Sequence, residues 1–455
     1  MSECCQAAMW ESVLAHGEET AARDEGRVAH LRLAAQKRER PRRLLLCLDG
    51  VPFEVIRAAQ ARGVFERFNE PARLLSPFPT MTNVALAQVF RASEPEGYES
   101  LYFDRDARRL AGGVRKYIGR RTPDKIPSSY MDELDYQEPL AFEFLIYVAS
   151  ETVWRADMRL FRERFLAAPP ARDFFGFLKA TDGLLHKCGP ERLNVALRSL
   201  DKILREVQDA AGSETEVVLF SDHGMNLEEN RRVHLQSHLR RYGFEVTNDF
   251  RGRAGRARVS APAFGLCSYA AVYCAEETAA AEVSHALSNL EGVDFSVRRG
   301  DEGRGVFVEG EKGAAVVERR EGADGRTLYR YGRVKGDPLA LASVARELEE
   351  AGLADAEGFA PDSEWLARTA THTYPDALAN LYASLHAPRV RQTADVLVSL
   401  RDGYYYGASA FGRMIRLAAT HGNALRASST AFMMSTHRRL PDFIRAADAR
   451  PVLKD

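Results

Sequence analysis

The order of apolar and polar residues changes sharply near residue 44. Residues 1–43 scatter a few apolar positions among Glu, Arg and Lys, which predicts a charged N-terminal helical arm ending at an Arg-Pro-Arg-Arg break. From residue 44 the run Leu-Leu-Leu-Cys-Leu is continuous and is followed by Asp-Gly. Such a run is typical of a strand that is buried on both faces. We therefore expect the packed part of the protein to begin at this strand.

Short apolar runs recur along the chain and alternate with helical periodicity. Four further runs lie at residues 174–178, 217–220, 396–398 and 431–434. Residues 191–207 place Leu, Ile and Val on one helical face. Strands that alternate with helices favour an α/β fold with a mostly parallel central sheet flanked by helices. We expect residues 44–255 and 359–455 to be the two parts of this core.

Two segments interrupt the alternation. Between residues 256 and 358 short strand-like runs are separated by Gly, Asp and Glu clusters, which predicts antiparallel hairpins in a smaller inserted α+β lobe. A second interruption, at about residues 94–170, is aromatic-rich and predicted to be helical. Either segment could form a wall or lid over a site, and a purely structural elaboration fits equally well.

The composition is that of an ordinary globular protein. Apolar residues make up 45% of the 455 positions, and Lys+Arg 63 against Asp+Glu 64 leave a net charge of −1, so neither nucleic acid nor an anionic membrane is an expected partner. No apolar run approaches the ~18 residues of a spanning helix. The six cysteines do not suggest a disulfide framework, and residues 1–6 do not resemble a signal peptide. The expected compartment is the cytoplasm.

Acidic and histidine side chains stand next to several of the predicted strands. They are Asp49, Asp182, His186, Asp222, His223 and His421. Because ligands of an open α/β sheet gather at the carboxyl ends of its strands, we expect these side chains to converge. Carboxylate oxygens and imidazole nitrogens suit divalent ions of the zinc type, and three or four ligands per ion would make two sites. A single histidine is more often structural, so this prediction depends on the coincidence of all six.

The segment Ser-Pro-Phe-Pro-Thr-Met-Thr-Asn-Val at residues 76–84 offers two hydroxyl nucleophiles, Thr80 and Thr82, ahead of a helical run. The start of a helix presents backbone N–H groups and a positive dipole end, which suit an incoming phosphate. The alternative is that Thr82 or Asn83 merely caps the helix, and the spacing alone favours neither interpretation.

In their order along the chain, these motifs resemble the type I phosphodiesterase/nucleotide pyrophosphatase branch of the alkaline-phosphatase superfamily. The resemblance extends over nearly the whole chain after residue 43. It is carried by Leu-Asp-Gly at 48–50, Phe-Pro-Thr-Met-Thr-Asn at 78–83, Asp-Gly-Leu-Leu-His at 182–186, Ser-Asp-His-Gly-Met at 221–225 and Thr-His-Gly at 420–422. It implies an alkaline-phosphatase-like central sheet.

Residue by residue, the resemblance also implies a metal-dependent mechanism with two divalent ions, zinc or alternatively manganese. One ion would bind Asp182, His186 and His421, and the other would bind Asp49, Asp222 and His223. Thr82, the second threonine of a Pro-Thr-x-Thr element, would be the nucleophile and would form a threonyl-phosphate intermediate. Asn83 would donate to a phosphoryl oxygen. The expected reaction is hydrolysis of a phosphodiester or pyrophosphate bond in a small phosphorus-containing substrate.

Other substrates remain open, because residues 83–86 read Asn-Val-Ala-Leu where the nucleotide pyrophosphatases have Phe-Pro-Asn-His. The alternatives are a phosphonate or phosphomonoester hydrolase and, less favoured, a non-catalytic binding protein with the same fold. Sulfatases need a Cys/Ser-x-Pro-x-Arg element, which is missing around Thr82, and the phosphoglycerate mutases of this fold use a serine. The sequence leaves the oligomeric state open.

Three other histidines, His234, His238 and His372, are expected to lie outside the metal set, because six ligands already complete it. His234 and His372 could still line the substrate pocket. A structural role is the more common one for a histidine of this kind.

Overall fold

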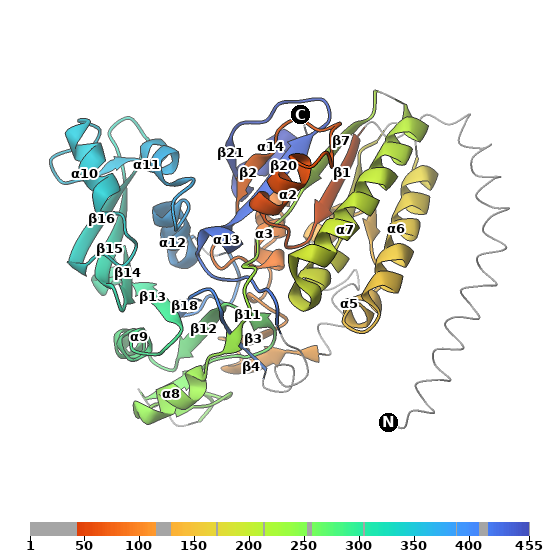
Figure 1. The fold of residues 1–455 in the computed structure, drawn as a ribbon. Coiled ribbons are helices and arrows are strands. Elements are labelled where there is room, and N and C mark those ends of the chain that lie inside the picture. Colours follow the sequence, from red (N-terminus) through yellow and green to blue (C-terminus); the bar gives the residue numbers. More distant parts are fainter. Residues whose placement is uncertain are drawn as a thin grey trace, which may run out of the picture.

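The computed structural model describes residues 43–114, 129–169, 172–212, 214–252, 257–303, 305–387, 389–408 and 417–454. The arm predicted for residues 1–43 lies outside this set except for its last residue. The described chain builds two large sheets with helices around them, together with two smaller sheets (Figure 1).

The first sheet is the predicted core. Its order is β21 (Phe443–Arg445), β2 (Ala72–Leu75), β20 (Thr430–Ser435), β7 (Glu216–Phe220), β1 (Arg43–Leu48), β6 (Phe174–Leu178) and β5 (Tyr136–Gln137). β1 runs parallel to both β6 and β7, and β20 runs antiparallel to its neighbours β7 and β2. The expected α/β class with a mostly parallel central sheet is therefore confirmed.

Helices cover both faces of this sheet, which explains why its central strands read as continuous apolar runs. Leu44, Leu46 and Leu48 share one core with α2 (Phe53–Gln60), α6 (Ser150–Ala167) and α7 (Ala180–Ala211). Leu45 and Cys47 point to the opposite face, where they pack with α3 (Thr82–Phe90) and α14 (Ala449–Lys454). Successive strand residues thus bury opposite faces. The helix predicted over 191–207 is the larger part of α7.

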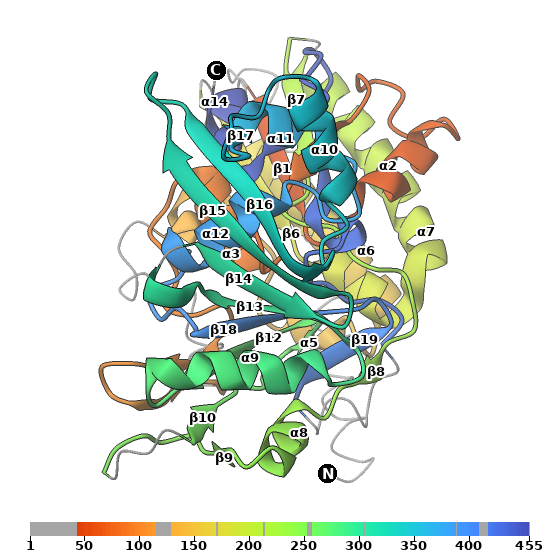
Figure 2. The same cartoon turned by 90° about the vertical axis from the view of Figure 1, so that its left-hand side faces the viewer.

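The second sheet has nine strands and is largely antiparallel. Its order is β17 (Ala360–Pro361), β16 (Thr327–Gly336), β15 (Gly313–Glu321), β14 (Val306–Gly310), β13 (Val293–Arg299), β18 (Val396–Leu400), β12 (Tyr269–Cys274), β10 (Arg258–Ser260) and β9 (Glu245–Val246). The antiparallel hairpins expected between residues 256 and 358 are confirmed by β13 to β16. Figure 2 shows these strands in front, with β1, β6 and β7 behind them.

One strand expected in the central sheet lies in the second sheet. The run at 396–398 becomes β18, which pairs antiparallel with β12 and β13. The prediction was wrong because an apolar run buried on both faces has the same pattern in either sheet. Helices α9 (Ala280–Ser288), α10 (Ala342–Glu350), α11 (Asp362–Thr369) and α12 (Ala377–His386) pack on this second sheet.

The segment of residues 94–170 is more mixed than the helical insertion predicted for it. It contains the hairpin of β3 (Leu101–Asp104) and β4 (Arg109–Gly112), strand β5, the 3₁₀ helix η1 (Tyr130–Glu133), and helices α5 (Phe142–Leu145) and α6. A three-stranded sheet of β11 (Leu266–Cys267), β19 (Tyr404–Gly407) and β8 (Arg231–Arg232), with α8 (Leu235–Arg241) and α13 (Arg426–Ser429), completes the larger elements. Within the described residues, no helix has the length and apolar character needed to cross a membrane.

Candidate metal centre and active site

The predicted site residues leave the core at one edge, where the parallel strands β1, β6 and β7 end. Asp49 follows β1 directly, and Asp222 and His223 follow β7 after a single serine. Asp182 and His186 lie in the first two turns of α7, just after β6. His421 comes from the loop before α13, the short helix that leads into β20. All six side chains are buried.

The six residues form two groups of three. In each group, one ligand atom from every residue lies within 4.8 Å of the others. The groups are Asp182, His186 and His421, and Asp49, Asp222 and His223. They adjoin each other, because the rings of His223 and His421 stack with their centroids 3.9 Å apart. This grouping is the one that the family resemblance implies.

The three histidines share one orientation. Each places Nδ1 next to a backbone carbonyl oxygen, so the neutral ring donates from Nδ1 and keeps its lone pair on Nε2. The opposite nitrogens point into the two groups. The carbonyl partners are those of Ala419 for His186 at 2.8 Å, Gly224 for His223 at 2.9 Å and Thr80 for His421 at 2.8 Å.

Each carboxylate in the two groups has one buried oxygen with no hydrogen-bond partner among the described residues. These atoms are Asp49 Oδ2, Asp182 Oδ1 and Asp222 Oδ2. A buried, unpaired carboxylate oxygen is costly unless a cation compensates it. Three such oxygens facing three imidazole lone pairs form a donor set that fits divalent ions.

The pKa shifts of the ligand residues also indicate that the protein itself supplies too little positive charge to balance the buried carboxylates. Burial, followed by the charges of Asp222 and Asp182, raises the pKa of Asp49 well above its usual range. Burial also raises the pKa of Asp222 to about 6. Burial lowers the pKa of His223 to about 4 and that of His421 to about 3, which keeps both rings neutral at pH 7.

Asp182 and His186 behave differently because they face each other, with Asp182 Oδ1 3.2 Å from His186 Nε2. Burial alone would raise the pKa of Asp182, but its interactions with His186 and His421 outweigh burial and lower it. Burial alone would lower the pKa of His186, and the charge of Asp182 outweighs that effect and raises it.

Thr82 lies beside the second group. It is the first residue of α3, and its Oγ1 is 3.2 Å from His223 Nε2 and 3.3 Å from Asp49 Oδ1. The N-cap of α3 is Met81, and no side chain makes a capping hydrogen bond. The alternative that Thr82 or Asn83 merely caps the helix is therefore wrong. The Thr82 hydroxyl faces the metal-ligand groups instead.

Thr80 has a separate role. It is fully buried, and its hydroxyl accepts from the N–H of Gly422 at 2.8 Å and donates to the carbonyl of Asn423 at 3.2 Å. Both partners follow His421 in the chain. Thr80 thus fastens the segment that carries Thr82 to the loop that carries His421, and its hydroxyl is occupied.

Several supporting residues were not predicted from the sequence. The Gly50 N–H donates to Asp222 Oδ1 at 3.2 Å, and the Thr181 hydroxyl donates to the Asp49 carbonyl at 2.7 Å. Gly50 has φ +73, and a Cβ there would stand 3.2 Å from Asp182 Oδ1. Gly50 follows Asp49 and Thr181 precedes Asp182 in the sequence. Their position next to predicted ligands is the signal by which they could have been found.

Lys179 was also not predicted. It begins the segment that leads into α7, and its ammonium pairs with the Glu143 carboxylate of α5 at 2.9 Å. Its charge also acts on the centre, where it lowers the pKa of Asp49 against the larger effects that raise it. No sequence pattern linked this lysine to the ligands.

The three other histidines considered in the sequence, His234, His238 and His372, are absent from both groups. His238 Nε2 lies 2.8 Å from the Ala286 carbonyl, and His234 precedes α8 in a groove with Arg231 and Arg232. His372 Nδ1 accepts from the Tyr374 N–H at 3.2 Å. None of them belongs to either ligand group in the described residues, and their place outside the metal set stays a prediction.

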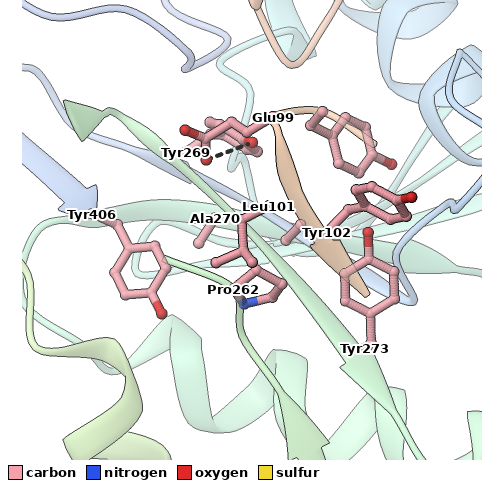
Figure 3. A pocket seen from close by; sticks show the side chains of 10 residues that line it. Glu99, Leu101, Tyr102, Pro262, Tyr269, Ala270, Tyr273 and Tyr406 are labelled. Carbon is pink, nitrogen blue, oxygen red and sulfur yellow. Dashed lines mark hydrogen bonds between the residues drawn. The ribbon is translucent and has the colours of Figure 1, made fainter. Parts of the chain in front are cut away.

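A small cavity lies between the β3–β4 hairpin and β12 (Figure 3). Its volume of about 10 Å³ is enough for roughly one water molecule, which excludes a substrate. Burial raises the pKa of Glu99 in its wall to about 7, and this carboxylate accepts from the Tyr269 hydroxyl at 3.2 Å. The neighbouring Ser268 N–H donates to the His421 carbonyl at 2.7 Å, so the cavity wall supports the histidine loop.

Comparison with solved structures finds chains of similar fold at low sequence identity. Murine ectonucleotide pyrophosphatase/phosphodiesterase 5 has 12% identity, with 90% of this chain and 93% of that chain covered and a TM-score of 0.46. Phosphonoacetate hydrolase from Sinorhizobium meliloti 1021, in complex with phosphonoacetate, has 14% identity, coverage of 91% and 94%, and a TM-score of 0.46. No curated protein matches the chain.

The family comparison is more decisive. The family model described as type I phosphodiesterase/nucleotide pyrophosphatase matches residues 97–334, which is more than half of the chain. This range contains Asp182, His186, Asp222 and His223, while Asp49, Thr82 and His421 lie outside it and are brought to the same place by the fold. The chain therefore belongs to the type I phosphodiesterase/nucleotide pyrophosphatase family of phosphoester hydrolases.

Proposed function

We propose that this protein hydrolyses a phosphodiester or pyrophosphate bond in a small phosphorus compound, with Thr82 as the nucleophile beside two divalent ions. The observation that carries the proposal is the position of the Thr82 hydroxyl. It lies 3.2 Å from His223 Nε2 and 3.3 Å from Asp49 Oδ1, at the first residue of a helix. A phosphoryl group at this helix start meets backbone N–H groups and the positive end of the dipole.

The two ligand groups would hold the ions. When bound, the ions would lower the pKa of the threonine hydroxyl and offset negative charge on the phosphoryl oxygens. Three carboxylates and three neutral imidazoles carry three negative charges. Two divalent ions exceed that charge by one positive unit, which would offset the negative charge of the deprotonated Thr82 oxygen. The mixed nitrogen and oxygen donors suit zinc, and manganese is the alternative.

The chain supplies the covalent step. The deprotonated Oγ1 of Thr82 attacks phosphorus and forms a new P–O bond, while the bond to the leaving oxygen breaks and its electron pair goes to the leaving group. The product is a phosphate ester of Thr82. Water then attacks the same phosphorus, the bond to Thr82 breaks, and the threonine oxygen regains a proton. Asn83, the next residue on α3, donates to a nonbridging oxygen in both steps.

The test compares three substrates on the purified protein loaded with zinc or with manganese. They are bis-p-nitrophenyl phosphate, p-nitrophenyl phosphate and phosphonoacetate. We expect the highest kcat/KM for the diester and loss of turnover in Thr82→Ala with bound metal retained. Preference for the monoester or for phosphonoacetate would reassign the substrate class. A protein that binds no metal and is inactive on all three would overturn the proposal in favour of a binding role.

A further inference from the structure

Asn83 is held in one orientation by a residue that no part of the proposed mechanism uses. The hydroxyl of Tyr130 donates to Asn83 Oδ1 at 2.9 Å. Tyr130 belongs to η1, in the insertion at residues 94–170, 47 positions away in the sequence. The two residues therefore join the insertion to the first turn of α3, directly beside Thr82.

The direction of this hydrogen bond determines which end of the amide is left for a ligand. A primary amide has an accepting oxygen at one end and two donor hydrogens at the other. Since Oδ1 is engaged by Tyr130, the donor Nδ2 is the free end, and it has no acceptor within the described chain. A donor attracts an anionic phosphoryl oxygen, whereas the flipped amide would present its oxygen and repel it.

The element that carries Tyr130 is fastened to α3. Tyr130, Met131 and Leu134 share an apolar core with Leu86, Val89 and Phe90 of α3. Arg450 reinforces this contact, because its guanidinium donates to the Phe90 carbonyl and reaches the Glu133 carboxylate at 3.4 Å. Tyr130 itself is only 5% exposed. A buried hydroxyl on an anchored helix can fix the side chain that it meets.

We propose that Tyr130 is a positioning residue, which holds the Asn83 amide with Nδ2 directed at the nonbridging oxygen of the phosphoryl group. The inference rests on the proposed function and deepens it, because it assigns part of the recognition of the phosphoryl group to the insertion. The hydroxyl of Tyr130 meets the site at Asn83, the residue that follows the proposed nucleophile. Its effect on turnover passes through Asn83.

The test is a double-mutant cycle on the full-length, metal-loaded enzyme with Tyr130→Phe, Asn83→Ala and the double variant. Loss of one oxyanion donor costs about 10²-fold in kcat, so Asn83→Ala should fall by about that factor. Tyr130→Phe keeps the ring and removes one hydrogen bond, so kcat/KM should fall roughly tenfold. In the Asn83→Ala background, the same substitution should change kcat/KM by less than about twofold.

A second readout does not need turnover. Orthovanadate, a phosphate-like anion, should bind Tyr130→Phe more weakly than wild type by a similar factor. The control is Tyr331→Phe, which removes another buried hydroxyl, one that donates to the side-chain carboxylate of Asp337 at 2.7 Å. It should leave both kcat/KM and vanadate affinity unchanged, and the thermal midpoints of both variants are compared to exclude loss of folding.

The outcomes separate the two proposals. Wild-type kcat/KM and vanadate affinity in Tyr130→Phe would overturn the positioning role and leave the proposed function standing. The same would follow if Tyr130→Phe lost equal activity with and without Asn83, because the effect would then not pass through the amide. Full activity in Asn83→Ala would show that turnover does not need the Asn83 amide as a donor, and this would also overturn the positioning role of Tyr130. A wild-type enzyme inactive on every ester would overturn both.

Discussion

The carbonyl oxygen of Thr80 lies 2.8 Å from Nδ1 of His421, a histidine 341 positions further along the chain. The hydroxyl of the same threonine bonds to both residues that follow this histidine. A single buried residue thus orients one metal-ligand candidate and fixes the segment that delivers the nucleophile. The position of the His421 loop and the position of the start of α3 are therefore linked through Thr80.

Replacing Thr80 should disturb this link without touching the nucleophile. Thr80→Val keeps the shape but leaves the Gly422 N–H without its acceptor, at a cost of about 1–3 kcal/mol in the free energy of unfolding. Zinc affinity and kcat should both fall, since His421 loses its fixed position. Urea unfolding and zinc titration measure the two effects. Thr80→Ser retains the hydroxyl and should remain near wild type, and equal losses in both variants would contradict the assignment.

Replacing Thr82 should lower kcat and leave zinc binding unchanged, unlike the replacement of Thr80. Thr82→Ala removes the hydroxyl next to His223 and Asp49 but leaves all six ligand side chains in place. We expect kcat to fall by about 10³- to 10⁵-fold, because loss of a nucleophile removes the covalent route. The zinc content measured by elemental analysis should stay at the wild-type value, and Thr82→Ser should recover part of the activity. A kcat within tenfold of wild type would rule out the threonyl-phosphate route.

Much of the candidate site could be predicted from the sequence because its residues adjoin strong local patterns. Asp49 and Asp222 stand just after strands whose apolar runs are buried on both faces, and Asp182 follows a third. Strand ends of a parallel sheet converge by construction, so position along the chain was enough to place these carboxylates together.

The rest depends on contacts between distant segments. The hydrogen bonds of Thr80 to Gly422 and Asn423 support the proposal of Thr82 as the nucleophile, and no local pattern encodes them. The hydrogen bond of Tyr130 to Asn83 joins residues 47 positions apart, a contact that no local pattern encodes. β18 has the same apolar pattern as a central strand, and only its pairing with β12 and β13 places it in the second sheet.

Removal of the metal should destabilise the folded protein. The unpaired oxygens of Asp49, Asp182 and Asp222 lose their compensating charge when a chelator is present. Zinc at about a thousand times its Kd should stabilise the protein by about 4 kcal/mol relative to the metal-free form. Differential scanning calorimetry at increasing zinc measures this as a rising thermal midpoint.

The matched pair for this effect is His421→Ala and His238→Ala. His421 belongs to a ligand group, whereas His238 is buried against the Ala286 carbonyl, away from both groups. The zinc-dependent rise should shrink in His421→Ala and persist in His238→Ala. Equal zinc responses in the two variants would show that the predicted group does not bind the ion.

The stability of the metal-free protein should depend on pH through Asp222. Its folded pKa of about 6 lies above the ordinary value of 3.8, so the folded state holds a proton that the unfolded state releases between these values. This carboxyl therefore favours folding below about pH 4, and its contribution is lost as pH rises through 6. Asp222→Asn keeps an acceptor for the Gly50 N–H but removes the buried charge.

Metal-free Asp222→Asn should consequently be more stable than metal-free wild type at pH 7, by about 3 kcal/mol, and the difference should vanish near pH 4. Zinc should reverse the order at pH 7, because the wild-type carboxylate then gains a cation while the amide is a poor ligand. Urea unfolding at both pH values, with zinc or with a chelator, measures all four states. A variant less stable than wild type at pH 7 without metal would show that the buried charge is already compensated by the protein.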